Sequence, residues 1–407
     1  MRAVVLCATL AALSLPSGVD AQSLPLTEAE ALARLSPASP RVLAMRADIA
    51  VAGAEVLAAG RWPNPRVIYD RESVAGVRED ILTVSQVLPI TGRRRFEVKA
   101  ASAVVDATSS RADAALRRAR ADLRLAFGLL VAARLREHEL TSARDHLREL
   151  ADILAKREAA GDAAGFDRLR AEREVLDLDA DRAAAATDRA RAQAALAGFF
   201  ADIVDPSQLV ALDEPSARPD VPSLDALIDR AESTRGELLA LRKESEASQL
   251  SLQAAERRRV PEPEVVAGVK SSTVGGGDRG GVFTLQASVP LFDRHQPELA
   301  LASARATQAS ARAEALRRAV RAEVGALRAA VVEGRDTAAR YRSGAVSMIG
   351  EIERIAQVSY DAGERGILEL LDAYRTGASA RLRLAALDAA VRDAEIELEF
   401  ASGWEIR

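Results

Sequence analysis

The sequence of 407 residues contains a single cysteine, Cys7. It lies in a segment with the features of an export signal: Arg2 comes first, an apolar run follows over Val4–Leu15, and small residues end at Ala21. We expect residues 1–21 to be a signal peptide; a buried N-terminal helix is the less favoured alternative. Removal of the signal peptide would take Cys7 with it and leave the mature chain without a thiol. That would exclude disulfides, zinc–thiolate sites and cysteine nucleophiles.

Aromatic residues make up only 3% of the chain, and no charge of one sign dominates, since the net charge is −4. The many arginines are matched by acids, which argues against a nucleic-acid surface. No stretch after the signal offers the roughly 18 consecutive apolar residues of a spanning helix. Any contact with a membrane would therefore come from strands or a surface helix. Charged residues make up 29%, and the abundance of Ala, Leu, Arg, Asp and Glu is typical of long helices.

Proline and glycine are nearly absent from several long stretches, which predicts long helices. Between Gly92 and about Ala160 there is no proline and one internal glycine. Within this stretch leucines recur at intervals of seven, as in a coiled coil, at 116, 123, 130 and again at 140, 147, 154. A return helix is expected from about 165 to 200. Further helices are expected at 26–35, 40–60, 223–233, 236–258, 297–362 and 367–401, with a linker at 203–222.

Four short runs rich in β-branched residues predict strands at about 65–72, 80–88, 264–272 and 281–289. The last run is the most regular, because apolar residues at 283, 285, 287 and 289 alternate with polar ones. The glycine-rich segment 275–281 lies between two strands and lacks the Lys-Ser/Thr pair of a phosphate loop. It is therefore expected to be a hairpin loop.

The order of elements occurs twice. Gly161 and Gly363 lie 202 positions apart, each in a turn between two helices. A Pro-x-Pro sequence precedes each strand pair, at 63–65 and 261–263. We therefore predict a first repeat over 22–215 and a second over 216–407. The helical hairpin tips are expected at about 160–167 and 362–372.

Four strands cannot close a barrel, and an open sheet edge is not tolerated in hydrocarbon. If the strands span a membrane, several copies must pool them, and three copies would supply a 12-stranded barrel with a lumen. Trp62 and Phe292, at the strand rims, are candidate membrane-interface residues. Ordinary packing at a helix-to-strand junction is the open alternative for both. The predicted fold is mainly α with a small β part, a duplicated helix–strand–strand–helix repeat whose long coiled-coil helices form an α-barrel.

Two acids near the second tip, Glu369 and Asp372, are three residues apart and so share one helix face. Threefold repetition would place two rings of carboxylates around an axis, and such rings favour cations. The alternative is a pair of solvated surface acids.

With these features the chain resembles the outer-membrane efflux, or TolC-like, family over nearly its whole mature length. The resemblance rests on the duplicated order, the two Pro-x-Pro sequences, the V-L-P-I-T-G-R-R-R segment at 87–95 and the tip sequence from Tyr360 to Asp372. It implies a homotrimeric exit duct in the outer membrane that extends into the periplasm. It also implies a periplasmic adaptor and an inner-membrane pump as partners. Short chains of this kind resemble heavy-metal exit ducts, but Cys, Met and His are too few here to indicate metal selection.

The resemblance further implies roles for the tip residues. Tyr360 and Arg365 are expected to bond to Asp167 or its surroundings and, with Glu369 and Asp372, to form the periplasmic gate. The best-known member has Asp where this chain has Glu369. The residues expected to dock the adaptor are Gly161, Asp162, Gly363 and Glu364.

No local motif groups a nucleophile with a base, so we expect no enzyme and no cofactor. His138 and His146 are too far apart in sequence to share one metal, and His295 is isolated along the chain, so no metal site is expected. The alternative function is that of a periplasmic coiled-coil adaptor or scaffold.

Overall fold

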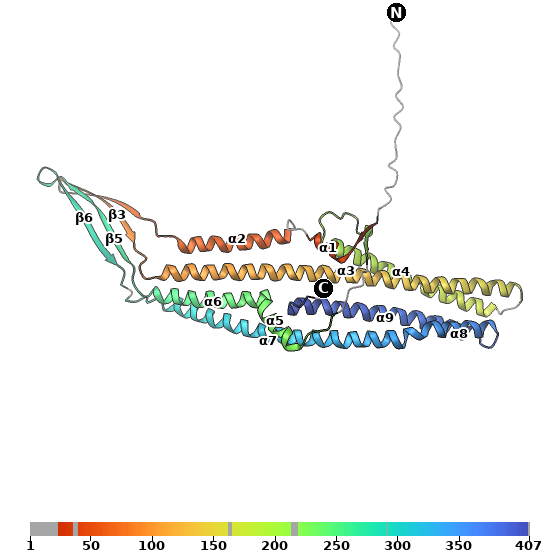
Figure 1. The fold of residues 1–407 in the computed structure, drawn as a ribbon. Helices are drawn as coiled ribbons and strands as arrows, with labels where there is room; N and C mark the ends of the chain where they lie inside the picture. Colours follow the sequence, from red (N-terminus) through yellow and green to blue (C-terminus); the bar gives the residue numbers. More distant parts are fainter. Residues whose placement is uncertain (1–22, 36–39, 162–164, 213–218, 290, 406–407) are drawn as a thin grey trace, which may run out of the picture. The chain divides into compact units, whose positions relative to one another are not determined.

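The computed structural model describes residues 23–35, 40–161, 165–212, 219–289 and 291–405 (Figure 1). The expected signal peptide, with Cys7, lies outside the described residues. The chain divides into two compact units. We call the described residues within 36–125, 216–345 and 387–407 the sheet unit, and the described residues within 1–35, 126–215 and 346–386 the hairpin unit. Helices α3 (Arg93–Ala159) and α9 (Ile367–Ser402) contribute to both.

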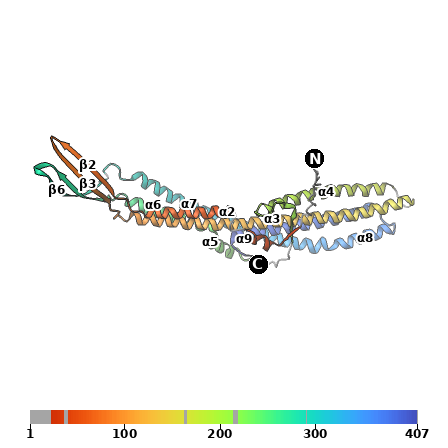
Figure 2. The ribbon, with the colours of Figure 1, turned by 90° about the horizontal axis from the view of Figure 1, so that it is seen from above.

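The sheet unit contains one antiparallel sheet of four strands in the order β2-β3-β5-β6. Their bounds are β2 Arg66–Val74, β3 Val77–Val87, β5 Pro263–Ser272 and β6 Asp278–Ala287. Figures 1 and 2 show these strands side by side as two hairpins. The pairing of β3 with β5 joins the two hairpins, one from each predicted repeat. All four expected strands are therefore present.

The hairpin turns are tighter than the sequence pattern indicated. Between β2 and β3 the turn reduces to Ala75 and Gly76, both with positive φ (50° and 87°), the combination found in type I′ hairpins. The loop between β5 and β6 carries three glycines with positive φ, and β6 begins at Asp278, three residues before the expected start. Segment 275–281 thus lies in a hairpin, as expected, although part of it belongs to the strand.

The helices of the sheet unit include α2 (Pro40–Gly60), α5 (Leu224–Thr234), α6 (Gly236–Arg257) and α7 (Gln296–Gly344). Helices α6 and α7 run next to each other (Figure 1). A hydrophobic core joins α5, α6, α7 and the end of α9. Its members are Leu227, Ala231, Leu238, Val320, Val324, Val331, Leu398, Ala401 and Trp404.

The hairpin unit pairs the end of α3 with α4 (Gly165–Ala197), and α8 (Ile349–Asp361) with the start of α9. Its core contains Leu147, Leu150, Ala151, Leu154, Ala171, Val175, Ile367, Leu370 and Leu371. Five of the six leucines spaced by seven along α3 are buried, all except Leu116. The heptad pattern in the sequence therefore identified the packed face of α3 correctly.

The helix expected over 297–362 is interrupted. Helix α7 ends at Gly344, a 3-10 turn covers Val346–Met348, and α8 follows. The hydroxyl of Ser343 donates to the carbonyl of Ala339, a local bond that tends to bend helices, and glycine has low helix propensity. The interruption coincides with the boundary between the two units.

Two short elements of the hairpin unit were not expected. The expected helix at 26–35 is shorter, α1 Glu28–Ala33, and is preceded by β1 (Leu24–Leu26). β1 pairs in parallel with β4 (Leu209–Ala211), within the expected linker, after a 3-10 turn at Pro206–Gln208. Strands of three residues carry too little periodicity to be recognised, and only their pairing partner defines them.

Candidate functional site

The second hairpin tip is a closed helix end built around Gly363. The amide of Gly363 donates to the carbonyl of Tyr360 (3.0 Å), and the amide of Glu364 donates to the carbonyl of Ser359 (2.9 Å). These two bonds form the Schellman motif, which requires positive φ at the residue after the cap, and Gly363 has φ of 71°. Gly363 therefore ends α8 at a defined position. The side chains of Glu364 and Arg365, which follow it, are exposed.

The first tip also turns at a glycine with positive φ. Gly161 has φ of 84°, and its amide donates to the carbonyl of Glu158 (2.9 Å). Arg168, in the first turns of α4, bonds the carboxylates of Glu158 (2.5 Å) and Glu172 (2.6 Å). This ion pair ties the end of α3 to the return helix. No sequence motif indicates this ion pair, because the turn separates the two partners. Asp162 lies outside the described residues.

Of the expected gate residues, Tyr360 is half-buried and packs against the core of the hairpin unit. The guanidinium of Arg157 lies 5.7 Å from the centre of its ring, within range of a cation–π contact. Arg365 is exposed and Asp167 is partly exposed. Among the described residues of one chain, no hydrogen bond or ion pair joins Asp167 to Tyr360 or Arg365.

Glu369 and Asp372 lie at the start of α9 and are both exposed. Their neighbours Leu370 and Leu371 are buried in the core of the hairpin unit, at 0% and 3% exposure. Because the core fixes the buried face of this helix, the two acids are held on its outer side. The structure therefore keeps them together on one accessible face.

Polar contacts not indicated by the sequence hold α9 against its neighbours in the hairpin unit. The hydroxyl of Tyr374 donates to Gln357 of α8 (3.0 Å), and Arg381 forms ion pairs with Glu353 (3.2 Å) and Glu139 (3.4 Å). Burial, together with nearby carboxylates, raises the pKa of Tyr374 above its usual value near 10. Tyr374 therefore remains a neutral hydrogen-bond donor at ordinary pH.

The two faces of the four-stranded sheet differ in chemistry. The strand register places one set of apolar side chains on a single face: Val67, Tyr69, Leu82, Val84, Val265, Ala267, Val269, Phe283 and Leu285. We call this set the apolar sheet face. Several of its members are strongly exposed, including Val67 (66%), Phe283 (74%) and Leu285 (65%). The opposite face is more polar and includes Thr83, Ser85, Lys270, Thr284 and Gln286.

The junction between sheet and helices is held by the segment 87–95. Glu262, in the second Pro-x-Pro sequence, accepts from Thr91 (3.0 Å) and pairs with Arg93 (3.3 Å). Arg94 donates to the carbonyl of Gly60 (3.0 Å) and lies 5.2 Å from the ring centre of Trp62. The two sequence motifs that precede and follow the strands thus contact each other.

The two aromatic residues expected at a membrane interface are both accessible. Trp62 is 57% exposed, although Arg94 covers part of its ring. Phe292 is fully exposed. Among the described residues, no helix combines the length and the apolar character that crossing a membrane requires.

The fold is similar to that of several solved membrane proteins. A membrane protein from Pseudomonas aeruginosa is 21% identical, with a TM-score of 0.78, and the match covers 92% of this chain and 93% of that one. VceC from Vibrio cholerae is 17% identical (TM-score 0.77; 93% and 97% covered). The outer membrane channel MtrE from Neisseria gonorrhoeae, in its open state, is 18% identical (TM-score 0.72; 93% and 88% covered). At this identity the likeness establishes the fold.

A sequence comparison points to the same kind of protein. Residues 227–404 match the model of the family described as outer membrane efflux protein. No curated protein sequence matches this chain. The resemblance that the tip and Pro-x-Pro sequences indicated is thus confirmed by a family match in the second half and by a common fold over nine-tenths of the chain. The second half of the chain is therefore similar to the outer membrane efflux protein family, and the fold is similar over nine-tenths of the chain to that of solved membrane proteins.

Proposed function

We propose that this protein is the outer-membrane exit duct of an efflux system, formed by three copies of the chain. The observation that carries the proposal is the apolar sheet face. Large side chains such as Phe283 and Leu285 stand exposed on it, while the strands alternate with polar residues on the other face. This is the side-chain pattern of a membrane strand with lipid on one side and water on the other.

The sheet edges support the association of several copies. Within the described residues, β2 and β6 each pair on one side only, so the sheet has two open edges. Unpaired amide and carbonyl groups are costly in hydrocarbon, and a closed barrel removes them. Joining the β2 edge of one copy to the β6 edge of the next closes the sheet.

Three copies give the smallest such barrel with an open lumen. Two copies would supply eight strands, and side chains fill the interior of a barrel of that size. Three copies supply twelve, an even number of antiparallel strands. The helices would extend into the periplasm, and Trp62 and Phe292 would lie at the membrane interface.

The hairpin tips are the proposed periplasmic end. Gly161, Gly363 and Glu364 are exposed there, and together with Asp162 they are the proposed docking surface for a periplasmic adaptor, which connects the duct to an inner-membrane pump. Asp167, Tyr360, Arg365, Glu369 and Asp372 are the proposed gate. Under this proposal the chain performs no catalytic step, and selectivity for the exported substrate lies in the pump.

The alternative, a periplasmic adaptor or scaffold, is not favoured. A coiled-coil adaptor needs one helical hairpin, whereas this chain has two hairpin tips and two strand pairs that share one sheet. The family match also describes an outer membrane protein.

The test is the location and native mass of the mature protein. Untagged protein would be expressed with its signal segment, the outer and inner membranes separated on a density gradient, and the mass of the detergent-extracted protein measured by light scattering corrected for detergent. We expect a trimer in the outer-membrane fraction. A soluble periplasmic monomer would refute the duct, and a membrane dimer or tetramer would refute the twelve-stranded barrel.

A further inference from the structure

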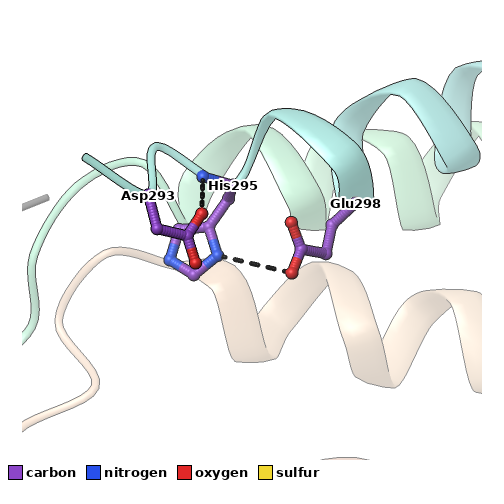
Figure 3. A group of neighbouring side chains, drawn as sticks. All are labelled: Asp293, His295 and Glu298. Atoms are coloured by element: carbon purple, nitrogen blue, oxygen red, sulfur yellow. Dashed lines mark hydrogen bonds and ion pairs between the residues drawn. The ribbon is translucent and has the colours of Figure 1, made fainter.

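The start of α7 groups three side chains that no sequence motif connects. Asp293, His295 and Glu298 lie together in the loop after β6 and in the first turn of the helix (Figure 3). One ligand atom from each residue lies within 4.8 Å of the other two. His295 is isolated from the other histidines along the chain but is flanked in space by two carboxylates, because the turn into α7 brings residues 293 and 298 to the same side.

The backbone fixes the positions of these groups. The amide of His295 donates to Oδ1 of Asp293 (2.9 Å), and His295 adopts a left-handed conformation with φ of 56°. Pro297, within the first turn of α7, restricts the chain further. The loop therefore presents the imidazole beside the two carboxylates before any ligand arrives.

The imidazole nitrogen that faces Glu298 has no hydrogen-bond partner. Nδ1 of His295 is inaccessible to solvent and bonds to none of the described protein atoms, while Oε1 of Glu298 lies 3.9 Å away. A buried ring nitrogen without a partner has an unused lone pair or an unused proton. A cation between Nδ1 and the carboxylates would use that lone pair and bring the three ligand atoms together.

We propose that Asp293, His295 and Glu298 bind a first-row divalent cation, for which Zn²⁺ is the probe. One imidazole nitrogen and two carboxylate oxygens are a common ligand set for such ions, at about 2.0–2.2 Å from the metal. Ligand atoms at that distance in a tetrahedral arrangement lie roughly 3.4 Å apart. The exposed side chains of Asp293 and Glu298 would therefore move inward by an ångström or so, and water would complete the coordination.

The charges at this position favour a cation. A helix start carries a partial positive charge of about half an elementary charge, which by itself repels cations. Two ionised carboxylates outweigh it. The bound ion would connect the loop after β6 to the first turn of α7 and so stabilise this junction. This role is independent of the proposed duct.

The test is calorimetric titration of ZnCl₂ into the untagged full mature protein, in a buffer that does not bind metal. We expect one Zn²⁺ per chain, with affinity reduced at least tenfold in His295→Ala and in Glu298→Gln. His138→Ala is the matched control, since it removes an exposed histidine from a different helix. Glu298→Gln keeps the shape of the side chain, and circular dichroism would verify that each variant is folded.

Three results would overturn the proposal: the absence of Zn²⁺ binding at millimolar concentration, unchanged affinity in both site variants, or an equal loss of affinity in His138→Ala. The duct proposal is not affected by any of them. A monomeric, soluble protein that binds Zn²⁺ through His295 would refute the duct and leave the metal site intact.

Discussion

The guanidinium of Arg157, at the end of α3, lies 5.7 Å from the ring centre of Tyr360, at the end of α8. This contact links the two hairpin tips of one chain. It places Tyr360 against the first tip through Arg157 rather than through Asp167.

The first prediction concerns this gate. We expect the double variant Tyr360→Phe, Arg365→Ser to raise the single-channel conductance of the purified protein in planar bilayers several-fold, because the family resemblance assigns to the Tyr360 hydroxyl and the Arg365 guanidinium the polar contacts that close the tips of the assembled duct. Phenylalanine keeps the ring that Arg157 covers, so the core should stay packed. Arg354→Ser, on the same helix and paired within it to Glu351, is the control. Unchanged conductance of the double variant would argue against the gate.

The second prediction concerns ion selectivity. Glu369→Gln combined with Asp372→Asn should reduce the preference for cations over anions, because rings of carboxylates near the axis attract cations. The measurement is the reversal potential in a salt gradient. Glu333→Gln removes an exposed acid from α7 and serves as the control. If the reversal potential of the double variant equals that of the unmodified channel, the two acids do not line the conducting path.

The third prediction tests the apolar sheet face. An arginine on the lipid side of a membrane strand costs about 2–4 kcal/mol near the middle of the bilayer. Leu285→Arg should therefore strongly reduce the amount of trimer in the outer membrane. Thr284→Arg places the same side chain on the opposite face of the same strand and should be tolerated. Equal recovery of the two variants, measured by quantitative blotting of the outer-membrane fraction, would mean that this face does not contact lipid.

The fourth prediction concerns pH. Glu232, at the end of α5, bonds Arg321 (2.7 Å) and lies near Arg317 (3.4 Å) and Arg242 (3.9 Å). The hydrogen bond from Arg321 is the main cause of the lowered pKa of Glu232, and the three positive charges add to it. A carboxylate with a lowered pKa in the folded state contributes stability above its unfolded value, near 4.5, and this contribution disappears as the pH falls through the folded value.

We therefore expect Glu232→Gln to lower the midpoint of thermal unfolding at pH 7. The difference from the unmodified protein should shrink as the pH is lowered below about 4.5 and vanish below the folded pKa. Asp336→Asn, which breaks an exposed pair with Arg340 on α7, is the control and should change little at either pH. A difference that grows on acidification would contradict the assignment.

The fifth prediction concerns the core of the hairpin unit. Leu370 is fully buried among residues of α3, α4 and α9, so Leu370→Ala should destabilise this unit by about 2–5 kcal/mol. Leu368 is 49% exposed, and Leu368→Ala should have a much smaller effect. Hydrogen exchange of the amides in α9 would report the difference. Similar exchange in the two variants would show that this core does not determine the stability of the tip.

The sequence by itself determined the long helices, the strands and the tip turns, because each has a local cause. Leucines spaced by seven define the packed face of α3, and alternation between Phe283 and Ala287 defines a strand. Gly363 can adopt the positive φ that a helix end requires, so the tip could be located from the chain alone. The family resemblance followed from these same segments.

The tertiary structure alone decided which distant residues meet. The pairing of β3 with β5 joins residues such as Thr83 and Gly268, which are far apart in the sequence, and no local pattern encodes it. The same holds for β1 with β4, for Arg157 with Tyr360 and for Glu262 with Arg93. The grouping of Asp293, His295 and Glu298 depends on a left-handed turn that histidine adopts only in context. Local sequence propensity determines where helices and strands form. Contacts between helices and strands depend on the free energy of the whole packed chain, and a local sequence pattern contains no information about it.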